Sequence, residues 1–444
     1  MSANGVRDRD LPRRALVTGG AAGIGWAICR ALAADGVRCA IADIDGGLAH
    51  RRAHELVGMT AGDGHAPGGG RRLTHIAIPT DLADPAAAAR LCAQAADALG
   101  GLDIVINNAG VTETGGEEIA RLDPARFGRV VSVNLDSVSA ICEHARDRLD
   151  ADGVIVNIAS GAAWRPIPLR GAYSASKAAV VALTEALAQA WGSVGPRLCA
   201  IAPGFVRTDL VDTLVARGRL DLDAIVARIP LGRLIEPDDI AAAARFACSP
   251  EGGALHGRTL LVDGGSFAAA GAPLPVRAPV ALRDGTRTVA IIGDGALADA
   301  IAMSLDDVCR VVHADSLDGL QQGFAPDGLI AVMTASTGSA GEMLRNAQAI
   351  AAGCRTRLRP AAGFSLQWHC ELTGLATPGA RAAGAALEMF ARTLALEWAP
   401  DGWRVNAVSS DGRRRAAVAG LASFLAGPAA SAITATAIDT RVSS

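Results

Sequence analysis

The first half of the chain alternates between short apolar runs and longer Ala-rich segments with helical periodicity, such as residues 24–36 and 177–191. Apolar runs of strand length that lack polar alternation are typical of strands covered on both faces. Seven such runs are present, at residues 15–20, 37–45, 73–81, 102–110, 153–160, 196–204 and 257–265. Their alternation with helices predicts an α/β fold with a doubly wound, Rossmann-type parallel sheet and right-handed crossovers.

The pattern changes after residue 268, where a Pro-containing stretch without periodicity predicts a linker over residues 269–286. A second alternating unit follows. We therefore expect a first domain over residues 1–268 and a second, shortened Rossmann-like domain over residues 287–444. The Gly-rich residues 58–72 predict a surface loop within the first domain.

The second unit resembles a shortened copy of the first. Residues 288–305 repeat the pattern of residues 14–32, and residues 384–412 repeat that of residues 177–204. Self-similarity of this kind indicates tandem duplication. Strand-like residues 308–316 are followed almost directly by another strand-like run, so the copy should lack one strand and one helix.

Bulk composition excludes several classes of protein. The 444 residues are 50% hydrophobic and 20% charged, with a net charge of -3, which favours large buried cores over disorder. Intermixed charges argue against a nucleic-acid surface, because phosphate contacts need clustered positive charge. The nine cysteines are scattered, so we expect neither a disulfide framework nor a metal site.

Two segments bear on the membrane question. The N-terminus has no apolar run of the kind found in secretory signals, which favours a cytoplasmic protein. Residues 416–438 carry no charge before Asp439 and are long enough to suggest a membrane span. Interspersed Gly, Pro, Ser and Thr favour a buried helix, turn and strand there instead.

A glycine-rich turn, TGGAAGIG, occupies residues 18–25 between a strand and a helix. Gly19 allows a tight turn, Gly23 lets the backbone approach a pyrophosphate, and Gly25 lets the helix pack close to the sheet. The helix N-terminus then offers free N–H groups to phosphate. We expect this turn, including Ile24, to contact a dinucleotide.

Asp43 ends the second predicted strand, 24 residues after Gly19. A carboxylate there accepts hydrogen bonds from the ribose hydroxyls of NAD and repels the 2′-phosphate of NADP. No Arg follows immediately to offset it. The position therefore favours NAD as the cofactor, although a turn or helix-capping role is the alternative.

Tyr173 and Lys177 stand four residues apart at the head of a predicted helix, so they share one face. They are the chain's single tyrosine and single lysine. A lysine ammonium beside a phenol lowers the phenol's pKa from about 10, which allows proton transfer at moderate pH. A surface Tyr–Lys pair is the alternative.

These motifs together resemble the classical short-chain dehydrogenase/reductase family over roughly the first 265 residues. Besides the turn and YSASK, the match includes NNAG at 107–110, VNL around Asn134, Ser160, and the PG at 203–204. Ser160 and Tyr173 are 13 residues apart, as in the family pattern.

The resemblance implies a role for each matched residue. Tyr173 would be the general acid/base, Lys177 would tune it and bind the nicotinamide ribose, and Ser160 would polarise the substrate oxygen. Asn134 would hold a water in a proton relay. The remaining cofactor contacts implied by the family are Asp81, Leu82, Asn108, Ala109, Gly110, Pro203, Gly204, Val206 and Thr208.

The second unit lacks this chemistry. Ala380 aligns with Tyr173 and Gly384 with Lys177, so neither phenol nor ammonium is available. A GxGxxA turn after its first strand and Asp315 near the place of Asp43 keep nucleotide binding open. We expect a non-catalytic structural domain that replaces a neighbouring subunit. Two chains would then form a homodimer resembling a four-domain assembly.

The leading hypothesis is an NAD-dependent oxidoreductase that transfers hydride between nicotinamide and a small secondary alcohol or ketone. A reductase of 3-oxoacyl thioesters or related carbonyls is the first alternative. A non-catalytic NAD-sensing or scaffold protein is the alternative from another class. Arg165 and Arg170 border the expected pocket and suit an anionic substrate, but exposed arginines are common.

Overall fold

The computed structural model describes residues 12–60, 74–113, 116–192, 194–208, 211–212, 215, 221–270, 286–335, 340–360, 363–372 and 378–441. Most of the predicted loop at 58–72 and of the predicted linker at 269–286 lies outside the described residues. The domain boundaries at 1–268 and 287–444 therefore stay a prediction.

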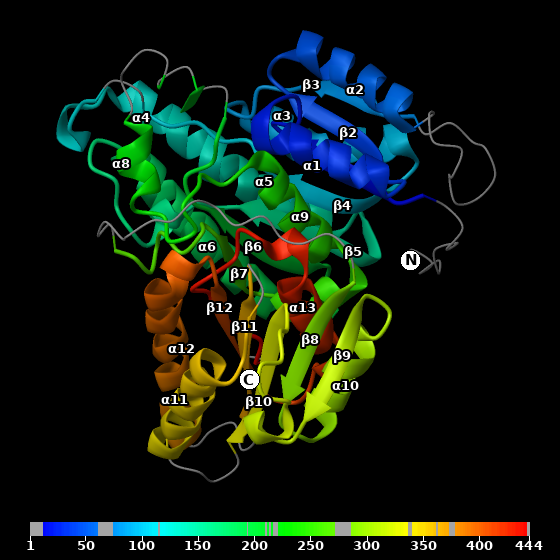
Figure 1. Cartoon of the computed structure of the whole chain (residues 1–444). Helices are drawn as coiled ribbons and strands as arrows, with labels where there is room; N and C mark the ends of the chain where they lie inside the picture. Colours follow the sequence, from blue (N-terminus) through cyan, green and yellow to red (C-terminus); the bar gives the residue numbers. More distant parts are fainter. Residues whose placement is uncertain are drawn as a thin grey trace. The chain divides into compact units, whose positions relative to one another are not determined.

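The first sheet has seven strands in the order β3-β2-β1-β4-β5-β6-β7 (Figure 1). Neighbouring strands from β3 to β6 pair in parallel. This order is that of a doubly wound Rossmann sheet, which confirms the predicted fold class. The strands are β1 (Arg14–Thr18), β2 (Arg38–Asp43), β3 (Ile76–Pro79), β4 (Leu102–Asn107), β5 (Leu149–Ile158), β6 (Arg197–Pro203) and β7 (Thr259–Val262).

Helices connect these strands, with α1 packed against α9 and α3 packed against α5. The helices are α1 (Gly23–Ala34), α2 (Gly46–Thr60), α3 (Pro85–Leu99), α4 (Pro124–Val131), α5 (Ser137–Arg146), α6 (Gly171–Trp191), α8 (Leu222–Val226) and α9 (Pro237–Cys248). Local sequence sets their ends. For example, the Asp84 side chain accepts a hydrogen bond from Ala86 N to begin α3, and Gly100 ends it at φ 76°.

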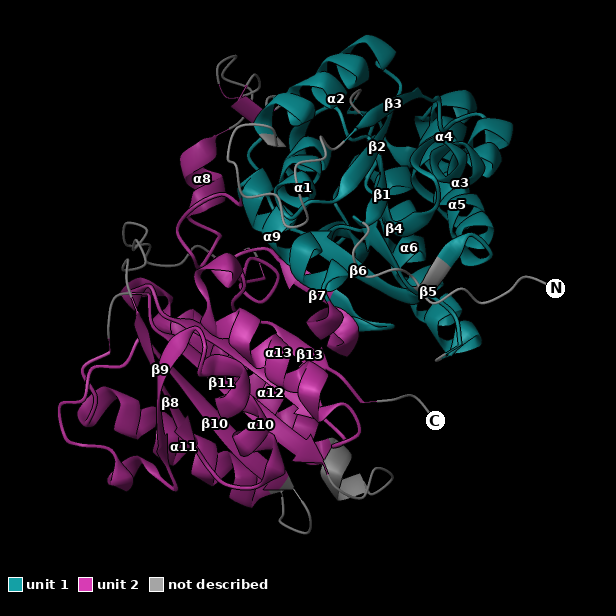
Figure 2. Cartoon of the chain, turned by 90° about the vertical axis from the view of Figure 1, so that its right-hand side faces the viewer, with its two compact units in different colours: residues 1–210, 236–249, 255–259 teal, residues 211–235, 250–254, 260–444 magenta. Residues whose placement is uncertain are grey.

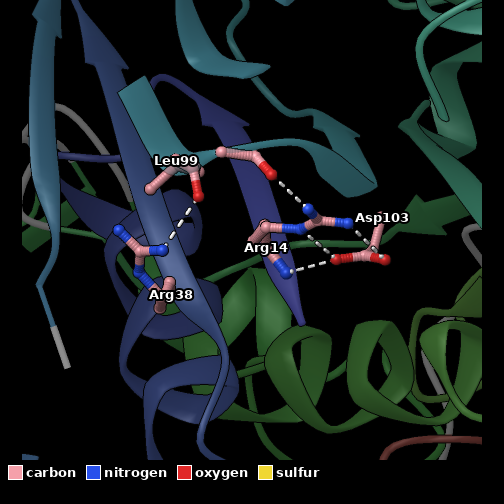
Figure 3. A network of polar contacts seen from close by, with 5 residues as sticks. Arg14, Arg38, Leu99 and Asp103 are labelled. Carbon is pink, nitrogen blue, oxygen red and sulfur yellow. Dashed lines mark hydrogen bonds and ion pairs between the residues drawn. The ribbon is translucent and has the colours of Figure 1, made fainter. Parts of the chain in front are cut away.

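Arginines bind the amino ends of the first sheet's strands (Figure 3). Arg14 at the start of β1 donates from Nε to the buried Asp103 carboxylate of β4 at 2.8 Å. Arg38 at the start of β2 donates to the Leu99 carbonyl at 2.8 Å, where α3 ends. A cation at a helix C-terminus is favourable. This cluster lies at the amino edge of a parallel sheet and is structural, because ligands bind at the carboxyl edge.

The second sheet has six parallel strands in the order β13-β12-β11-β10-β8-β9. They are β8 (Arg287–Ile292), β9 (Cys309–Ala314), β10 (Gly328–Ala335), β11 (Ser365–Leu372), β12 (Arg404–Ser410) and β13 (Ala437–Asp439). The helices are α10 (Ala296–Leu305), α11 (Ala340–Thr356), α12 (Pro378–Trp398) and α13 (Arg415–Ala426).

The order of the second sheet matches that of the first when β8 is set against β1 and β9 against β2. The counterparts of α2, β3 and α3 are missing, because β9 connects to β10 through the short 3-10 helix η5 (Leu317–Gly319). The copy therefore lacks one strand and two helices, one helix more than the sequence predicts. This confirms the expected shortened Rossmann-like domain. Helices α6 and α12 are each 21 residues long, and the strands that follow them, β6 and β12, have 7 residues each.

The same arginine contact recurs in both sheets. Arg197 at the start of β6 donates to the Ser249 carbonyl at the end of α9, at 2.8 Å. Arg404 at the start of β12 donates to the Leu425 carbonyl in the last turn of α13, at 3.1 Å. Both cations stabilise a helix C-terminus.

The chain divides into two compact units (Figure 2). Unit 1 contains residues 1–210, 236–249 and 255–259, and unit 2 contains residues 211–235, 250–254 and 260–444. Within unit 2, Gly264 N donates to the Ala432 carbonyl at 3.0 Å. The second sheet thus packs together with residues that directly follow β7 in sequence.

The uncharged residues 416–438 form most of α13, a 3-10 turn (Pro428–Ala430) and the start of β13, as predicted. Among the described residues, no helix has both the length and the apolar character needed to cross a membrane.

Candidate active site

The predicted site residues come together at the carboxyl ends of β1, β4, β5 and β6 in unit 1. Ser160 follows β5 and accepts a hydrogen bond from Ala162 N at 3.1 Å. Its hydroxyl also hydrogen-bonds the half-buried phenol of Tyr173, which lies in the first turn of α6. The two residues expected to contact the substrate oxygen therefore lie side by side.

Lys177 is one helical turn beyond Tyr173 and only 4% exposed. Its Nζ donates to the Ile158 carbonyl at 2.8 Å and lies 5.9 Å from the centre of the Tyr173 ring. Burial lowers the pKa of Lys177 to about 8. The Lys177 ammonium is therefore held against β5 near the Tyr173 ring, and burial destabilises its charged form.

The electrostatics of Tyr173 differ from the sequence-based prediction. Burial raises the pKa of Tyr173, while the hydrogen bond with Ser160 and the positive charge of Arg170 lower it. The upward effect of burial dominates. The expectation that Lys177 lowers the pKa of the phenol is thus not met here, because desolvation outweighs the neighbouring charges.

Asn134 is fully buried in a π-helical segment, Ser132–Asp136, between α4 and α5. Its Oδ1 accepts from Val111 N at 2.8 Å, and its Nδ2 donates to Ser176 Oγ at 3.1 Å. Asn134 therefore ties the loop after β4 to α6. A Cβ at Gly110 would lie 3.4 Å from both Asn134 Oδ1 and Lys177 Nζ, so Gly110 leaves room between these groups.

The glycine turn has the backbone geometry expected for a dinucleotide site. Gly19 and Gly23 have φ values of 59° and 51°, which favour glycine. A Cβ at Gly25 would come 2.0 Å from the Gly19 carbonyl oxygen, so no larger residue fits. Ile24 lies between them at the start of α1, half-buried. These residues fit a nicotinamide dinucleotide, whose phosphates would face the start of α1.

Polar side chains brace this turn. Asn108 Nδ2 donates to the Thr18 and Gly19 carbonyls at 3.0 and 3.1 Å, and Ala109 N donates to Thr18 Oγ1 at 3.1 Å. Asp43 Oδ2 accepts from Ala21 N at 3.0 Å. The Asp43 carboxylate thus lies beside the turn, where a ribose hydroxyl can reach it.

The remaining predicted cofactor contacts lie around the same edge. Leu82 is buried and Asp81 is half-exposed, 3.5 Å from the guanidinium of Arg129. Pro203 ends β6 and is followed by Gly204 and the half-buried Val206. Thr208 Cγ2 lies 4.0 Å from the position of a Cβ on Gly23. The segment after β6 therefore reaches the glycine turn.

Glu113 is a site residue that the sequence analysis missed. It is 7% exposed, and its Oε1 accepts from the backbone N–H groups of Ala172 at 2.7 Å and Tyr173 at 3.3 Å. It therefore caps the N-terminus of the helix that carries the phenol. A lone Glu in a loop carries no sequence signal for this, since its partners are 59 and 60 residues away.

Arg170 and Arg52 have specific roles that the sequence did not indicate. Arg170 donates to Thr112 Oγ1 at 2.8 Å and to the Glu113 carbonyl at 3.0 Å, so it holds the same loop. Arg52 of α2 donates to the Ala21 carbonyl at 3.3 Å. A guanidinium is thus close to the turn that Asp43 contacts, although no Arg immediately follows Asp43 in sequence.

Comparison with known proteins agrees with this geometry. Residues 19–266 match the family described as Enoyl-(Acyl carrier protein) reductase. The D-threitol dehydrogenase of Mycolicibacterium smegmatis is 35% identical over 254 residues, covering 56% of this chain and 91% of that protein. An uncharacterized short-chain type dehydrogenase/reductase of Sinorhizobium fredii is 36% identical over 254 residues; the match spans 56% of this chain but only 43% of that protein.

A solved structure shares the fold of the first sheet. The short-chain dehydrogenase of Burkholderia cenocepacia J2315, in complex with NADP, is 34% identical and has a TM-score of 0.50. The match covers 58% of this chain and 99% of that one. With more than half of its length matched by the family profile and the family's motifs assembled at one sheet edge, this chain belongs to the short-chain dehydrogenase/reductase family.

Proposed function

We propose that this protein is an NAD-dependent oxidoreductase that interconverts a secondary alcohol and a ketone in unit 1. The observation that carries the proposal is the hydrogen-bonded pair of Ser160 and Tyr173, with the Lys177 ammonium behind it. Relatives named as D-threitol dehydrogenase and galactitol 2-dehydrogenase support this reaction class.

When bound, the nicotinamide accepts or supplies the hydride. The protein's own residues handle the substrate oxygen. Ser160 Oγ donates a hydrogen bond to that oxygen, which fixes its position beside the phenol. Tyr173 takes the hydroxyl proton during alcohol oxidation and returns it during ketone reduction. Lys177 would bind the nicotinamide ribose through its ammonium, and Asn134 keeps the loop after β4 against α6.

We propose NAD rather than NADP because the Asp43 carboxylate lies beside the glycine turn and would repel a 2′-phosphate. The proposed metabolic setting is the cytoplasm, and the proposed active unit is a homodimer. We also propose that residues 287–444 are a non-catalytic duplicate of the first unit. Gly384 stands in α12 at the position of Lys177 in α6, so an ammonium is lacking there.

A Tyr173→Phe variant tests the proposal. Removing the phenol hydroxyl should lower kcat for alcohol oxidation by about 10²–10⁴-fold with a small change in the Kd for NAD, because the proton acceptor is lost while the cofactor contacts remain. Turnover is followed as NADH absorbance over a panel of polyols, hydroxy acids and hydroxyacyl thioesters.

The same panel separates the alternatives. A preference for acyl thioesters would identify a thioester reductase. If the native chain binds NAD but turns over no substrate in the panel, the oxidoreductase proposal fails in favour of a nucleotide sensor or scaffold.

A further inference from the structure

A cavity of about 770 Å³ lies in unit 2, at the carboxyl ends of β8, β9 and β10 and beside α11. Its size falls within the range of small-molecule sites in proteins. Carboxyl edges of doubly wound sheets are where such folds bind ligands. The cavity uses none of the residues of the candidate active site.

The cavity lies where the second sheet lacks the counterparts of α2, β3 and α3. In unit 1, α3 packs against α5 and the sheet. In unit 2, η5 replaces the whole connection between β9 and β10, so nothing equivalent to α3 lies beside α11. One face of α11 therefore lines the cavity, with Met343, Asn346, Ala349 and Ile350.

The turn beside the cavity keeps features of the glycine turn in unit 1. Gly293 N donates to the Ala314 carbonyl at 3.2 Å, as Gly20 N does to the Ala42 carbonyl at 3.3 Å. Gly293 has φ 111°, and a Cβ there would lie 2.3 Å from the Val332 oxygen of β10. Asp315 follows Ala314 directly, so it occupies the place that Asp43 occupies after Ala42.

The charges of the lining limit the ligand. The lining carries the acids Asp315, Asp318 and Glu342 and one base, Arg357, which forms an ion pair with Asp318. No described residue donates a hydrogen bond to the Asp315 carboxylate, which remains an acceptor for a ligand's hydroxyl groups. An acidic lining with one paired cation disfavours phosphate at this position.

Apolar residues supply the other half of the site. Leu317, Met343 and Ile350 line the cavity and offer a surface for a flat ring. The Asn346 amide carries a donor and an acceptor, the pair that recognises the edge of adenine.

We propose that this cavity binds a purine nucleoside without phosphate. The ribose hydroxyls donate to Asp315, and the base lies against the apolar residues with its edge toward Asn346. The site is separate from the cofactor site of unit 1 and does not rest on the proposed reaction.

Equilibrium dialysis of the full chain with radiolabelled adenosine, with unlabelled NAD present to occupy the cofactor site of unit 1, tests the cavity. Ala349→Trp fills the cavity and should abolish this binding, whereas Ala352→Trp, on an exposed position of α11 outside the lining, should leave it unchanged. Asp315→Asn should weaken binding about tenfold or more, because it removes a charged acceptor. Asp307→Asn is the matched control outside the cavity.

The ligand series tests the chemistry. Native protein should bind adenosine more tightly than 2′-deoxyadenosine, and Asp315→Asn should lose this discrimination. Adenosine should also bind more tightly than AMP. The proposal is overturned if Ala349→Trp binds adenosine as well as the native chain does. It is also overturned if the site that Ala349→Trp removes binds AMP more tightly than adenosine. NAD-dependent turnover and thermal melting of each variant show separately whether unit 1 and the fold are intact.

Discussion

At the scale of single residues, the site depends on side chains that hold one another in place. Tyr173 is positioned by its hydrogen bond with Ser160 and by the helix that Glu113 caps. Asp43 is positioned by the backbone of the turn. These supports lead to two predictions, one for the helix and one for cofactor choice.

Glu113→Ala removes a buried carboxylate and leaves the first N–H groups of α6 without their acceptor. We expect a loss of about 1–3 kcal/mol in the free energy of unfolding. We also expect kcat to fall about tenfold with little change in KM for NAD, since the phenol is displaced rather than removed. Urea unfolding and initial rates measure both.

Glu117→Ala is the control for that variant, because Glu117 is an exposed residue that pairs with Arg126. It should behave like the native chain. Equal effects of the two variants would show that Glu113 does not position the catalytic helix.

Asp43→Ser removes the carboxylate that would repel a 2′-phosphate. Arg52 of α2 contacts the same turn through the Ala21 carbonyl and can then attract that group. We expect the ratio of kcat/KM for NAD over kcat/KM for NADP to fall by about 10²-fold. Two charge effects contribute, because the repulsion by Asp43 is lost and the attraction by Arg52 is gained. Arg52→Ala in the Asp43→Ser background should reverse the gain with NADP. A native enzyme that already prefers NADP would contradict the assignment.

At the scale of elements, β11 of the second sheet is buried along its whole length, since all eight of its residues are buried. His369 in this strand shares a hydrogen bond with Gln367 Oε1 at 2.9 Å, and burial lowers its pKa to about 3. The imidazole is therefore neutral in the folded chain, whereas in the unfolded chain it takes up a proton below about pH 6.5.

This difference makes stability depend on pH. Because the unfolded state binds the extra proton between pH 6.5 and 3, stability is lost as pH falls through that window. At pH 5 the loss from His369 is about 2 kcal/mol. His369→Gln should reduce the difference in unfolding free energy between pH 8 and pH 5 by that amount. An unchanged difference in urea titrations would mean that His369 is solvated in the folded chain.

At the scale of the whole molecule, two similar sheets are carried by one chain of 45.0 kDa. Unit 2 includes residues before and after β7 as well as the second sheet. The second sheet therefore shares its compact unit with residues 211–235 and 250–254, which precede β7 in the sequence of the first domain. Exposed apolar residues on its helices are candidates for contact with a second chain.

Met389 is 60% exposed on α12, the counterpart of the catalytic helix. We expect a homodimer of twice 45.0 kDa in solution, in which this helix face is covered. Met389→Asp should shift light-scattering mass toward one chain. Met303→Asp, at a 76% exposed position on α10, is the control and should not. A monomeric native protein, or a four-chain assembly, contradicts the prediction.

Much of this protein was determined by sequence alone, because periodicity and backbone chemistry are local. Apolar runs predicted both parallel sheets, and the short connection after residue 316 predicted the missing strand. The glycine turn and the spacing of Ser160, Tyr173 and Lys177 predicted the residues that meet at one sheet edge, since strand ends and helix faces follow from residue number.

Only the tertiary structure decided what depends on burial and on contacts distant in sequence. It showed that desolvation raises the pKa of Tyr173, that Glu113 caps α6 from another loop, and that Arg52 reaches the turn beside Asp43. It also revealed the cavity beside α11. A sequence pattern shows that elements are missing after β9, but the space that their absence leaves depends on how the remaining side chains pack.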